Sequence, residues 1–146
     1  MMIRRVTPAD FKEILVIESE AFPKSRYDLG AFWSLFQQYP GTFLVVETDQ
    51  VDGYIIFSPD GHIVSMAVKA QRRRRGVGSG LIRAALAHCA DKVLRLEVRV
   101  SNLGARKFYE RFGFKIKDRL ERYYQDGEGA LIMERPISRD VEMIEP

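Results

Sequence analysis

The run from Arg72 to Gly80 constrains this chain more than any other segment. It reads RRRRGVGSG, four arginines followed by a glycine at every second position, and it separates an apolar stretch from an amphipathic one. Glycine lets a backbone approach a ligand closely and adopt positive φ. A helix that begins here adds unpaired N–H groups and a positive dipole end, and arginines add forked hydrogen bonds to phosphate. The run therefore predicts a phosphate-binding turn between a strand and a helix.

Length and charge indicate one domain with a local basic region. The chain has 146 residues, of which 46% are hydrophobic, and a chain of this size buries about 70% of its unfolded surface. We expect the domain to span residues 1–136, with residues 137–146 as a short C-terminal tail. The net charge is only +3 and much of the excess lies in the arginine run. That suits a small anionic ligand at least as well as a polyanion.

Several classes of protein are disfavoured by residue usage. Cys89 is the single cysteine, which excludes an intrachain disulfide and a multi-cysteine zinc site and suits a reducing cytoplasm. His62 and His88 show no ligand spacing, so we expect both to be structural and expect no metal site. No apolar stretch approaches the ~20 residues that cross a bilayer, and the N-terminus lacks a signal-peptide segment. We expect a cytoplasmic protein with no membrane partner.

Hydrophobic periodicity predicts seven strands and four helices. The strands are expected at 2–6, 42–47, 53–57, 62–68, 93–100, 114–124 and 130–135; the helices at 8–21, 28–39, 79–90 and 103–112. Hairpins combined with strand–helix–strand crossovers imply a mixed sheet with helices on both faces. The predicted class is α/β (α+β).

Taken alone, the glycine run has two interpretations. It is either a ligand loop or a solvated basic turn before a helix, and it fits neither the mononucleotide nor the dinucleotide glycine pattern. It does fit Arg73-x-x-Gly76-x-Gly78, which resembles the (Q/R)-x-x-G-x-(G/A) pyrophosphate loop of the GCN5-related N-acetyltransferases (GNAT).

Other segments extend the resemblance over residues 1–136. LEVRVSN at 96–102 and FYERFGF at 108–114 are similar to the RimI-like branch, the protein N-terminal acetyltransferases. IESEAFP at 17–23, RYY at 122–124 and ALIM at 130–133 resemble its first substrate loop and last hairpin. The resemblance implies a GNAT fold of about seven strands and four helices. It also implies acetyl-CoA as donor, a protein N-terminal α-amino group as acceptor, and allows proximity to the ribosome.

Two residues are candidates for the chemistry. Glu97 alternates with aliphatic residues, which most often marks a solvent-facing strand surface; alternatively it faces a cleft and accepts the amine proton, the role that the resemblance implies. Tyr109 shares the apolar face of its helix, where an aromatic residue is more often core. The resemblance implies that its hydroxyl protonates the departing thiolate. A carboxylate base is sufficient for an α-amine, because the pKa of an α-amino group is near 8, well below the lysine value near 10.4, so the α-amine loses its proton more easily.

The resemblance also supplies binding residues. The cofactor-binding candidates are Met66, Ala67, Val68, Arg73, Arg74, Arg75, Gly76, Val77, Gly78, Ser79, Gly80 and Asn102; the substrate-binding candidates are Glu18, Phe22, Pro23, Tyr27, Tyr123 and Tyr124. Asn102 can serve equally as a helix cap. Glu18 lies on an apolar helix face, so it either pairs with a basic residue or lines the amine-binding end of the cleft. Lys24 stands where some N-terminal acetyltransferases carry glutamate, which leaves acidic or small N-termini open as substrates.

Three functions are weighed. The preferred one is direct acetyl transfer to a protein N-terminus, with a small amine or a lysine side chain as the alternative acceptor. A nucleic-acid-binding module using Arg72 to Arg75 is disfavoured by the modest net charge and the absence of a base-reading motif. The four arginines exceed what the loop pattern requires. The sequence does not specify an oligomeric state.

Overall fold

A computed structural model describes residues 1–24, 26–89 and 93–136, which form seven strands and four α-helices. The strands are β1 (Met2–Arg5), β2 (Phe43–Glu47), β3 (Val51–Phe57), β4 (Ile63–Val68), β5 (Leu94–Arg99), β6 (Lys115–Leu120) and β7 (Ala130–Arg135). The helices are α1 (Phe11–Ala21), α2 (Leu29–Gln38), α3 (Val77–His88) and α4 (Leu103–Arg111). The predicted order and class are confirmed. The predicted tail at 137–146 lies outside the described residues.

Some boundaries differ from those predicted. Helix α3 begins two residues early because Gly76, with φ of 82°, serves as its N-cap. Helix α1 begins at Phe11 because Pro8–Asp10 forms a separate 3-10 turn. Strand β6 ends at Leu120 rather than 124: Arg122 has a φ of 53°, and the Tyr124 N–H donates to the Glu128 carbonyl. The last positions of the predicted strand therefore belong to the β6–β7 turn.

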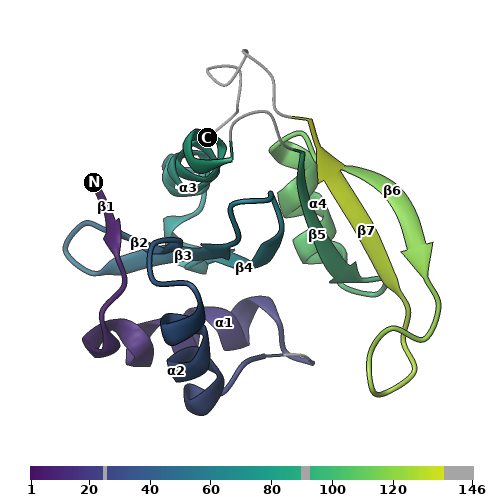
Figure 1. The fold of residues 1–146 in the computed structure, drawn as a ribbon, viewed down its shortest axis with the longest axis horizontal. Helices are drawn as coiled ribbons and strands as arrows, with labels where there is room; N and C mark the ends of the chain where they lie inside the picture. Colours follow the sequence, from purple (N-terminus) through teal and green to yellow (C-terminus); the bar gives the residue numbers. More distant parts are fainter. Residues whose placement is uncertain (25, 90–92, 137–146) are drawn as a thin grey trace.

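The predicted mixed sheet is present as two antiparallel sheets. One has the order β1-β2-β3-β4 and the other β5-β7-β6 (Figure 1). An isolated parallel bridge between His62 and Arg95 joins them where β4 and β5 begin. Beyond this bridge, β4 and β5 diverge. There the Tyr109 hydroxyl from α4 donates a hydrogen bond to the Met66 carbonyl at 3.2 Å, in the place that a β5 amide would take in a continuous sheet. The opening between β4 and β5 is where a ligand can enter.

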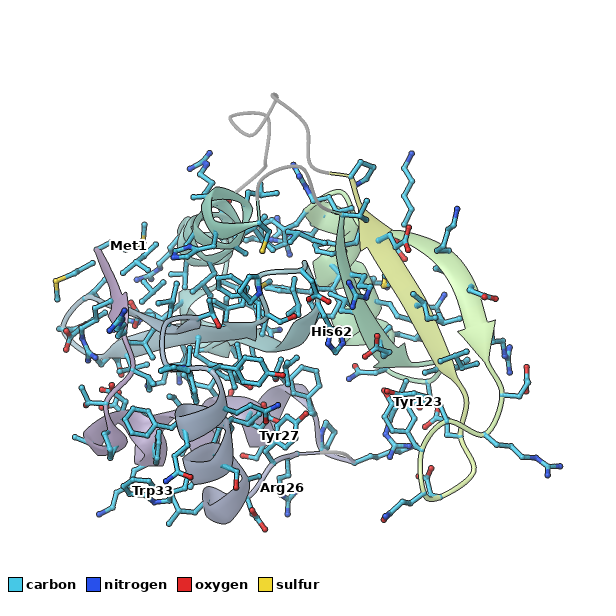
Figure 2. All side chains as sticks on the ribbon, in the orientation of Figure 1. Met1, Arg26, Tyr27, Trp33, His62 and Tyr123 are labelled. Atoms are coloured by element: carbon cyan, nitrogen blue, oxygen red, sulfur yellow. The ribbon has the colours of Figure 1, made fainter. Side chains whose placement is uncertain are left out.

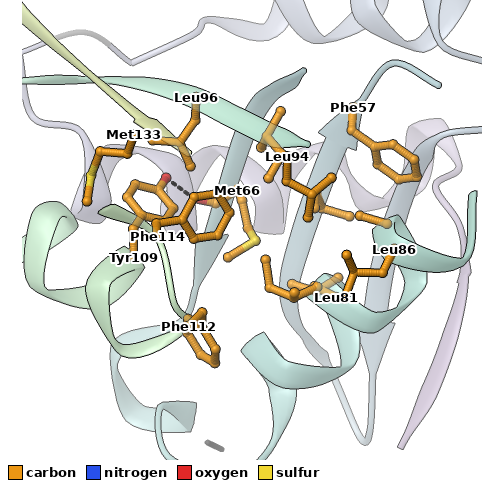
Figure 3. Close-up of a cluster of buried hydrophobic side chains, with 14 of the residues drawn as sticks. Phe57, Met66, Leu81, Leu86, Leu94, Leu96, Tyr109, Phe112, Phe114 and Met133 are labelled. Atoms are coloured by element: carbon orange, nitrogen blue, oxygen red, sulfur yellow. Dashed lines mark hydrogen bonds between the residues drawn. The ribbon is translucent and has the colours of Figure 1, made fainter. Parts of the chain in front are cut away.

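Helices cover both faces. Helices α1 and α2 pack on one face of the four-stranded sheet, and α3 lies on the other, with α4 against the three-stranded sheet (Figure 1). Figure 3 shows the cluster that α3 and α4 share with both sheets, including Leu81, Phe112 and Phe114. A Cβ on Gly78 would lie 2.6 Å from Phe112 Cζ. Glycine at that position thus permits the close approach of α3 and α4, which fixes the start of α3 beside the opening.

Candidate functional site

Three adjoining cavities occupy the opening between the sheets. The β4-edge cavity lies along Met66 to Val68 and reaches Arg73; the central cavity lies between β4 and β5; the entry cavity lies beside Pro23 and Lys24. Phe22 lines all three. The shared walls make one branched cleft, whose branches meet at Phe22.

Glu97 faces this cleft rather than open solvent. Its side chain is 22% exposed and lines both the central and the entry cavities, while its neighbours Leu96 and Val98 are buried in the core. The Glu97 Oε1 lies 2.9 Å from His62 Nε2. Of the two interpretations of the alternating strand, the structure thus favours the cleft-facing one. A carboxylate here can accept a proton from a bound amine.

His62 was expected to be structural, and its contact with Glu97 was not predicted. It precedes β4, and the parallel bridge to Arg95 sets it two positions from Glu97 along β5. Figure 2 shows His62 near the opening that Tyr27 and Tyr123 flank from their separate loops. Only the parallel register of β4 and β5 could have revealed this pair, because the two residues are 35 positions apart.

Tyr109 lies at the junction of the central and β4-edge cavities. It is a core residue of α4, 4% exposed, and its hydroxyl donates to the Met66 carbonyl (Figure 3). Burial raises the pKa of Tyr109 far above its usual value, and the nearby Glu18 carboxylate adds to the rise. The phenol therefore holds its proton and is available as a proton donor.

Glu18 is buried in the wall of the central cavity, with 1% of its surface exposed. Its carboxylate accepts hydrogen bonds from the Tyr54 hydroxyl, from Ser65 Oγ at 3.1 Å and from the Tyr27 amide at 3.0 Å. Burial raises the pKa of Glu18 to about 7, against the hydrogen bonds from Tyr27 and Ser65, which lower it. The Glu18 carboxylate therefore pairs with two hydroxyls and an amide rather than with a basic side chain. Of the two alternatives from the sequence, the cavity-lining one is the one that the structure shows.

The edge of β4 and the start of α3 present backbone groups. Because peptide groups of alternate residues point to opposite strand edges, Met66 and Val68 turn theirs to the edge that meets Tyr109, away from β3. The intervening Ala67 turns its peptide groups toward β3. At α3, Gly80 donates to the Gly76 carbonyl at 3.0 Å, so the amides of Gly76, Val77 and Gly78 precede this helical bond.

The predicted loop residues therefore divide into two groups: some belong to helix α3, and others lie at or beside the β4-edge cavity. Gly80 was expected to bind cofactor, but its amide is committed to the helix and a Cβ there would lie 3.2 Å from Ile3. Ser79 is buried in α3. Arg73 lines the β4-edge cavity, whereas Arg74 and Arg75 are exposed beside it, Arg74 with a φ of 63°.

Arg72 has a structural role. Its guanidinium lies 3.3 Å from Asp49 and 3.5 Å from the buried Asp52. These ion pairs connect the arginine run to the β2–β3 turn. Arg72, one of the four arginines, therefore stabilises the fold.

A second network that the sequence did not reveal holds the β6–β7 turn. Arg99 lies 2.9 Å from Asp126 and 2.8 Å from Glu128, and its guanidinium carbon lies 4.1 Å from the centre of the Tyr124 ring. Tyr123 packs edge-on against Tyr124. The turn thereby places both tyrosines against the central cavity.

Asn102 has two contacts. Its Oδ1 accepts from the Ala105 amide at 3.0 Å, which caps α4, and its Nδ2 donates to the Ala21 carbonyl at 3.1 Å. It lines both the β4-edge and the entry cavities. The predicted cap is therefore present, and the same side chain joins α4 to the end of α1.

Two further features, a metal site and a membrane-spanning helix, are absent from the described ranges. Among residues 1–24, 26–89 and 93–136, no three His, Cys, Asp or Glu side chains come together as a metal site would require. No described helix has the length and apolar character to cross a membrane.

Comparison with known proteins is consistent with this geometry. The pattern of the acetyltransferase (GNAT) family matches residues 9–114. An uncharacterized N-acetyltransferase of Methanocaldococcus jannaschii is 40% identical over 143 residues, 91% of this chain and 90% of the relative. An N-alpha-acetyltransferase of Sulfurisphaera tokodaii is 36% identical over 92% of each chain. The crystal structure of Ard1 from Thermoplasma volcanium has a TM-score of 0.79 at 32% identity and covers 94% of this chain and 98% of its own.

The family pattern spans β4, the glycine loop, α3, β5 and α4, which form most of the cleft, and the Methanocaldococcus relative aligns over nine tenths of the chain. This chain belongs to the acetyltransferase (GNAT) family, and its acetyl donor is acetyl-CoA.

Proposed function

We propose that this enzyme acetylates the N-terminal α-amino group of proteins by direct transfer from acetyl-CoA. The observation that carries the proposal is that Glu97 and Tyr109 line one cavity while the β4-edge cavity adjoins it through Tyr109. An acyl donor along β4 and an amine beside Glu97 meet between these two residues. The Sulfurisphaera relative is itself named an N-alpha-acetyltransferase.

The β4 edge and the start of α3 fit acetyl-CoA. The peptide groups of Met66 and Val68, which face away from β3, suit the amides of a pantetheine arm, and the amides from Gly76 to Gly78 suit its pyrophosphate. Arg73 is placed to attract the phosphates. When bound, acetyl-CoA supplies the activated acetyl thioester.

Glu97 and Tyr109 have complementary roles in the proposed reaction. Glu97 accepts a proton from the α-ammonium group, which leaves the amine free to attack the thioester carbonyl, and His62 stabilises the Glu97 carboxylate from 2.9 Å. Tyr109 keeps its proton because burial raises its pKa, and it gives that proton to the departing sulfur. On forming the amide, the attacking nitrogen loses a second proton, which restores the Tyr109 hydroxyl, and Glu97 releases the first proton to solvent. The net change is one C–N bond formed and one C–S bond broken.

A peptide suits the acceptor side better than a small amine does. Phe22 and Tyr27 from the loop between α1 and α2 lie across the central cavity from Tyr123 and Tyr124 of the β6–β7 turn. These walls extend past the immediate surroundings of Glu97 into the entry cavity. An α-amine is also about a hundredfold easier to deprotonate than a lysine side chain.

Cys89 supports direct transfer. Its thiol is buried against the Ser58 carbonyl at 3.5 Å, and burial raises its pKa, which disfavours the reactive thiolate. An acetylated-enzyme intermediate on this cysteine is therefore not expected.

The test is acetylation of a peptide library varied at its first residues, with the modified nitrogen mapped by mass spectrometry. Acetylation confined to the α-nitrogen, with kinetics of a ternary complex, is the expected result. Preferred modification of lysine, faster turnover of a small free amine, or ping-pong kinetics would each contradict the proposal.

We place this activity in the cytoplasm, where new protein N-termini emerge from ribosomes. The exposed Arg74 and Arg75 provide positive charge outside the cleft, which suits a weak, peripheral contact with ribosomal RNA rather than specific binding of a nucleic acid. Salt-dependent co-sedimentation with ribosomes, lost in the double variant Arg74→Ala, Arg75→Ala, tests this placement.

A further inference from the structure

Glu18 is a buried carboxylate that the proposed reaction does not use. It lies in the last turn of α1 and receives donors from three other parts of the fold: Tyr54 on β3, Ser65 on β4 and the amide of Tyr27. Burying a carboxyl group is costly, so its retention calls for a role.

The contacts of Glu18 hold both ends of one loop. Its backbone carbonyl accepts the Phe22 amide at 2.8 Å, and its Oε2 accepts the Tyr27 amide at 3.0 Å. We call the described residues 22–24 and 26–28 the entry loop. Its beginning and its end are thus bonded to a single residue, which is itself bonded to β3 and β4 through its Oε1.

The entry loop supplies much of the acceptor side of the cleft. Phe22 lines all three cavities, Tyr27 lines the central one, and Pro23 and Lys24 line the entry cavity. Loss of the bond to the Tyr27 amide would free the end of the loop that faces Glu97.

We infer that Glu18 is a positioning residue for the acceptor: it holds the entry loop against the sheet so that the first residues of a peptide bind beside Glu97. This inference rests on the proposed function, because it concerns how the same site holds a peptide. Glu18 acts through the loop and does not touch the reacting atoms.

The geometry assigns this role to hydrogen bonding rather than to charge. A glutamine keeps one oxygen, which can accept the Tyr27 amide, and its NH₂ can donate to the hydroxyl oxygens of Tyr54 and Ser65, which accept as well as donate. An alanine leaves the Tyr27 amide and both hydroxyls without this partner. Glu18→Gln and Glu18→Ala therefore separate the two roles.

The experiment measures peptide KM, kcat and the acetyl-CoA Kd of Glu18→Ala and Glu18→Gln. We expect Glu18→Ala to raise the peptide KM at least tenfold while kcat and the acetyl-CoA Kd stay within threefold. We expect Glu18→Gln to keep the peptide KM within threefold of wild type. Glu13→Ala is the matched control, because Glu13 on the same helix accepts the Val51 amide at 2.9 Å, and its peptide KM should not change.

Hydrogen exchange provides a second measurement. The amide of Tyr27 should exchange at least tenfold faster in Glu18→Ala and remain protected in Glu18→Gln. If Glu18→Ala does not fold, Glu18→Asp replaces it with the same expectation, since its carboxylate is one methylene shorter and no longer reaches the Tyr27 amide.

The inference and the proposed function fail in different ways. If wild-type enzyme does not acetylate peptide N-termini, the proposed function is wrong. If wild type does so, an unchanged peptide KM in Glu18→Ala, or in its Glu18→Asp replacement, overturns the inference. A loss in Glu18→Gln equal to that in Glu18→Ala also overturns it, because charge would then be required.

Discussion

On the donor side of the cleft the binding groups belong to the backbone, whereas on the acceptor side they belong to side chains. The donor side consists of the free edge of β4 at Met66 and Val68 and the amides from Gly76 to Gly78. The acceptor side depends on His62, Glu97 and Glu18, which hydrogen bonds hold in place.

This difference determines how each side responds to substitution. A backbone site tolerates changes of side chain but not changes that disturb the path of the chain, as at Gly76 with its φ of 82°. A side-chain site loses function when one group is replaced, even if the fold is unchanged. Substitutions should therefore affect the two sides separately.

The largest effect is expected on the acceptor side from Glu97→Gln. The amide cannot accept the ammonium proton, so kcat should fall by about 100-fold to 10,000-fold. The acetyl-CoA Kd should stay within twofold, because the donor side is built from other residues. Steady-state kinetics and isothermal titration check the two numbers.

Arg95→Gln is the control for Glu97→Gln. Arg95 lies two positions earlier on β5 and pairs with the exposed Asp60 at 3.2 Å, outside the three cavities. It should retain wild-type kcat. Full activity in Glu97→Gln would remove this carboxylate from the proposed chemistry.

The next largest effect is expected on the pH dependence of the free energy of unfolding, through Glu18. Burial raises its pKa from 4.5 to about 7, so the folded protein holds this proton more tightly than the unfolded chain does. Stability from this group is fully present below about pH 4.5 and is lost as pH rises to about 7; the amount is about 3 kcal/mol. Urea unfolding of wild type and Glu18→Gln between pH 5 and 7 should show this fall in wild type only. Parallel pH profiles would contradict it.

A smaller loss of stability is expected where α3 approaches α4. In Gly78→Ala the added methyl meets Phe112 Cζ at 2.6 Å in the core, which should cost about 1–3 kcal/mol. Gly30→Ala in α2 is the control: its methyl has room, with the nearest atom at 3.6 Å, and should stabilise by about 0.5–1 kcal/mol. Thermal melts compare the two; equal melting temperatures would contradict the close packing.

The two sides also differed in how far the sequence predicted them. The path of the donor side follows from a local pattern, strand then glycine turn then helix, and the predicted turn at Gly76 is confirmed. Gly80 was included in the predicted ligand loop, and the helix was predicted to begin only at Ser79, two residues later than it does. The commitment of Gly80 to the first helical turn becomes visible only once the helix start is known.

The acceptor side depends on contacts between distant segments. His62 meets Glu97 only because β4 and β5 begin in parallel register, and Glu18 finds its donors on β3, on β4 and in the entry loop. Tyr123 and Tyr124 have strand-like side chains but lie in a turn that Arg99 holds. The sequence identified many of these residues as candidates, but not their partners.

The smallest effect tests the arginines on the donor side. Arg73→Ala should weaken acetyl-CoA binding about fivefold, more at low salt than at high salt, because an exposed charge near the phosphates is screened. Arg72→Ala should instead lower stability, by about 1 kcal/mol, because the buried Asp52 loses its ion pair. Its effect on acetyl-CoA Kd should be the smaller of the two. Titration of acetyl-CoA at two salt concentrations, together with melting curves, distinguishes an arginine that binds the ligand from one that stabilises the fold. If both variants weaken binding equally, the whole run acts as one electrostatic field and the division between Arg72 and Arg73 is wrong.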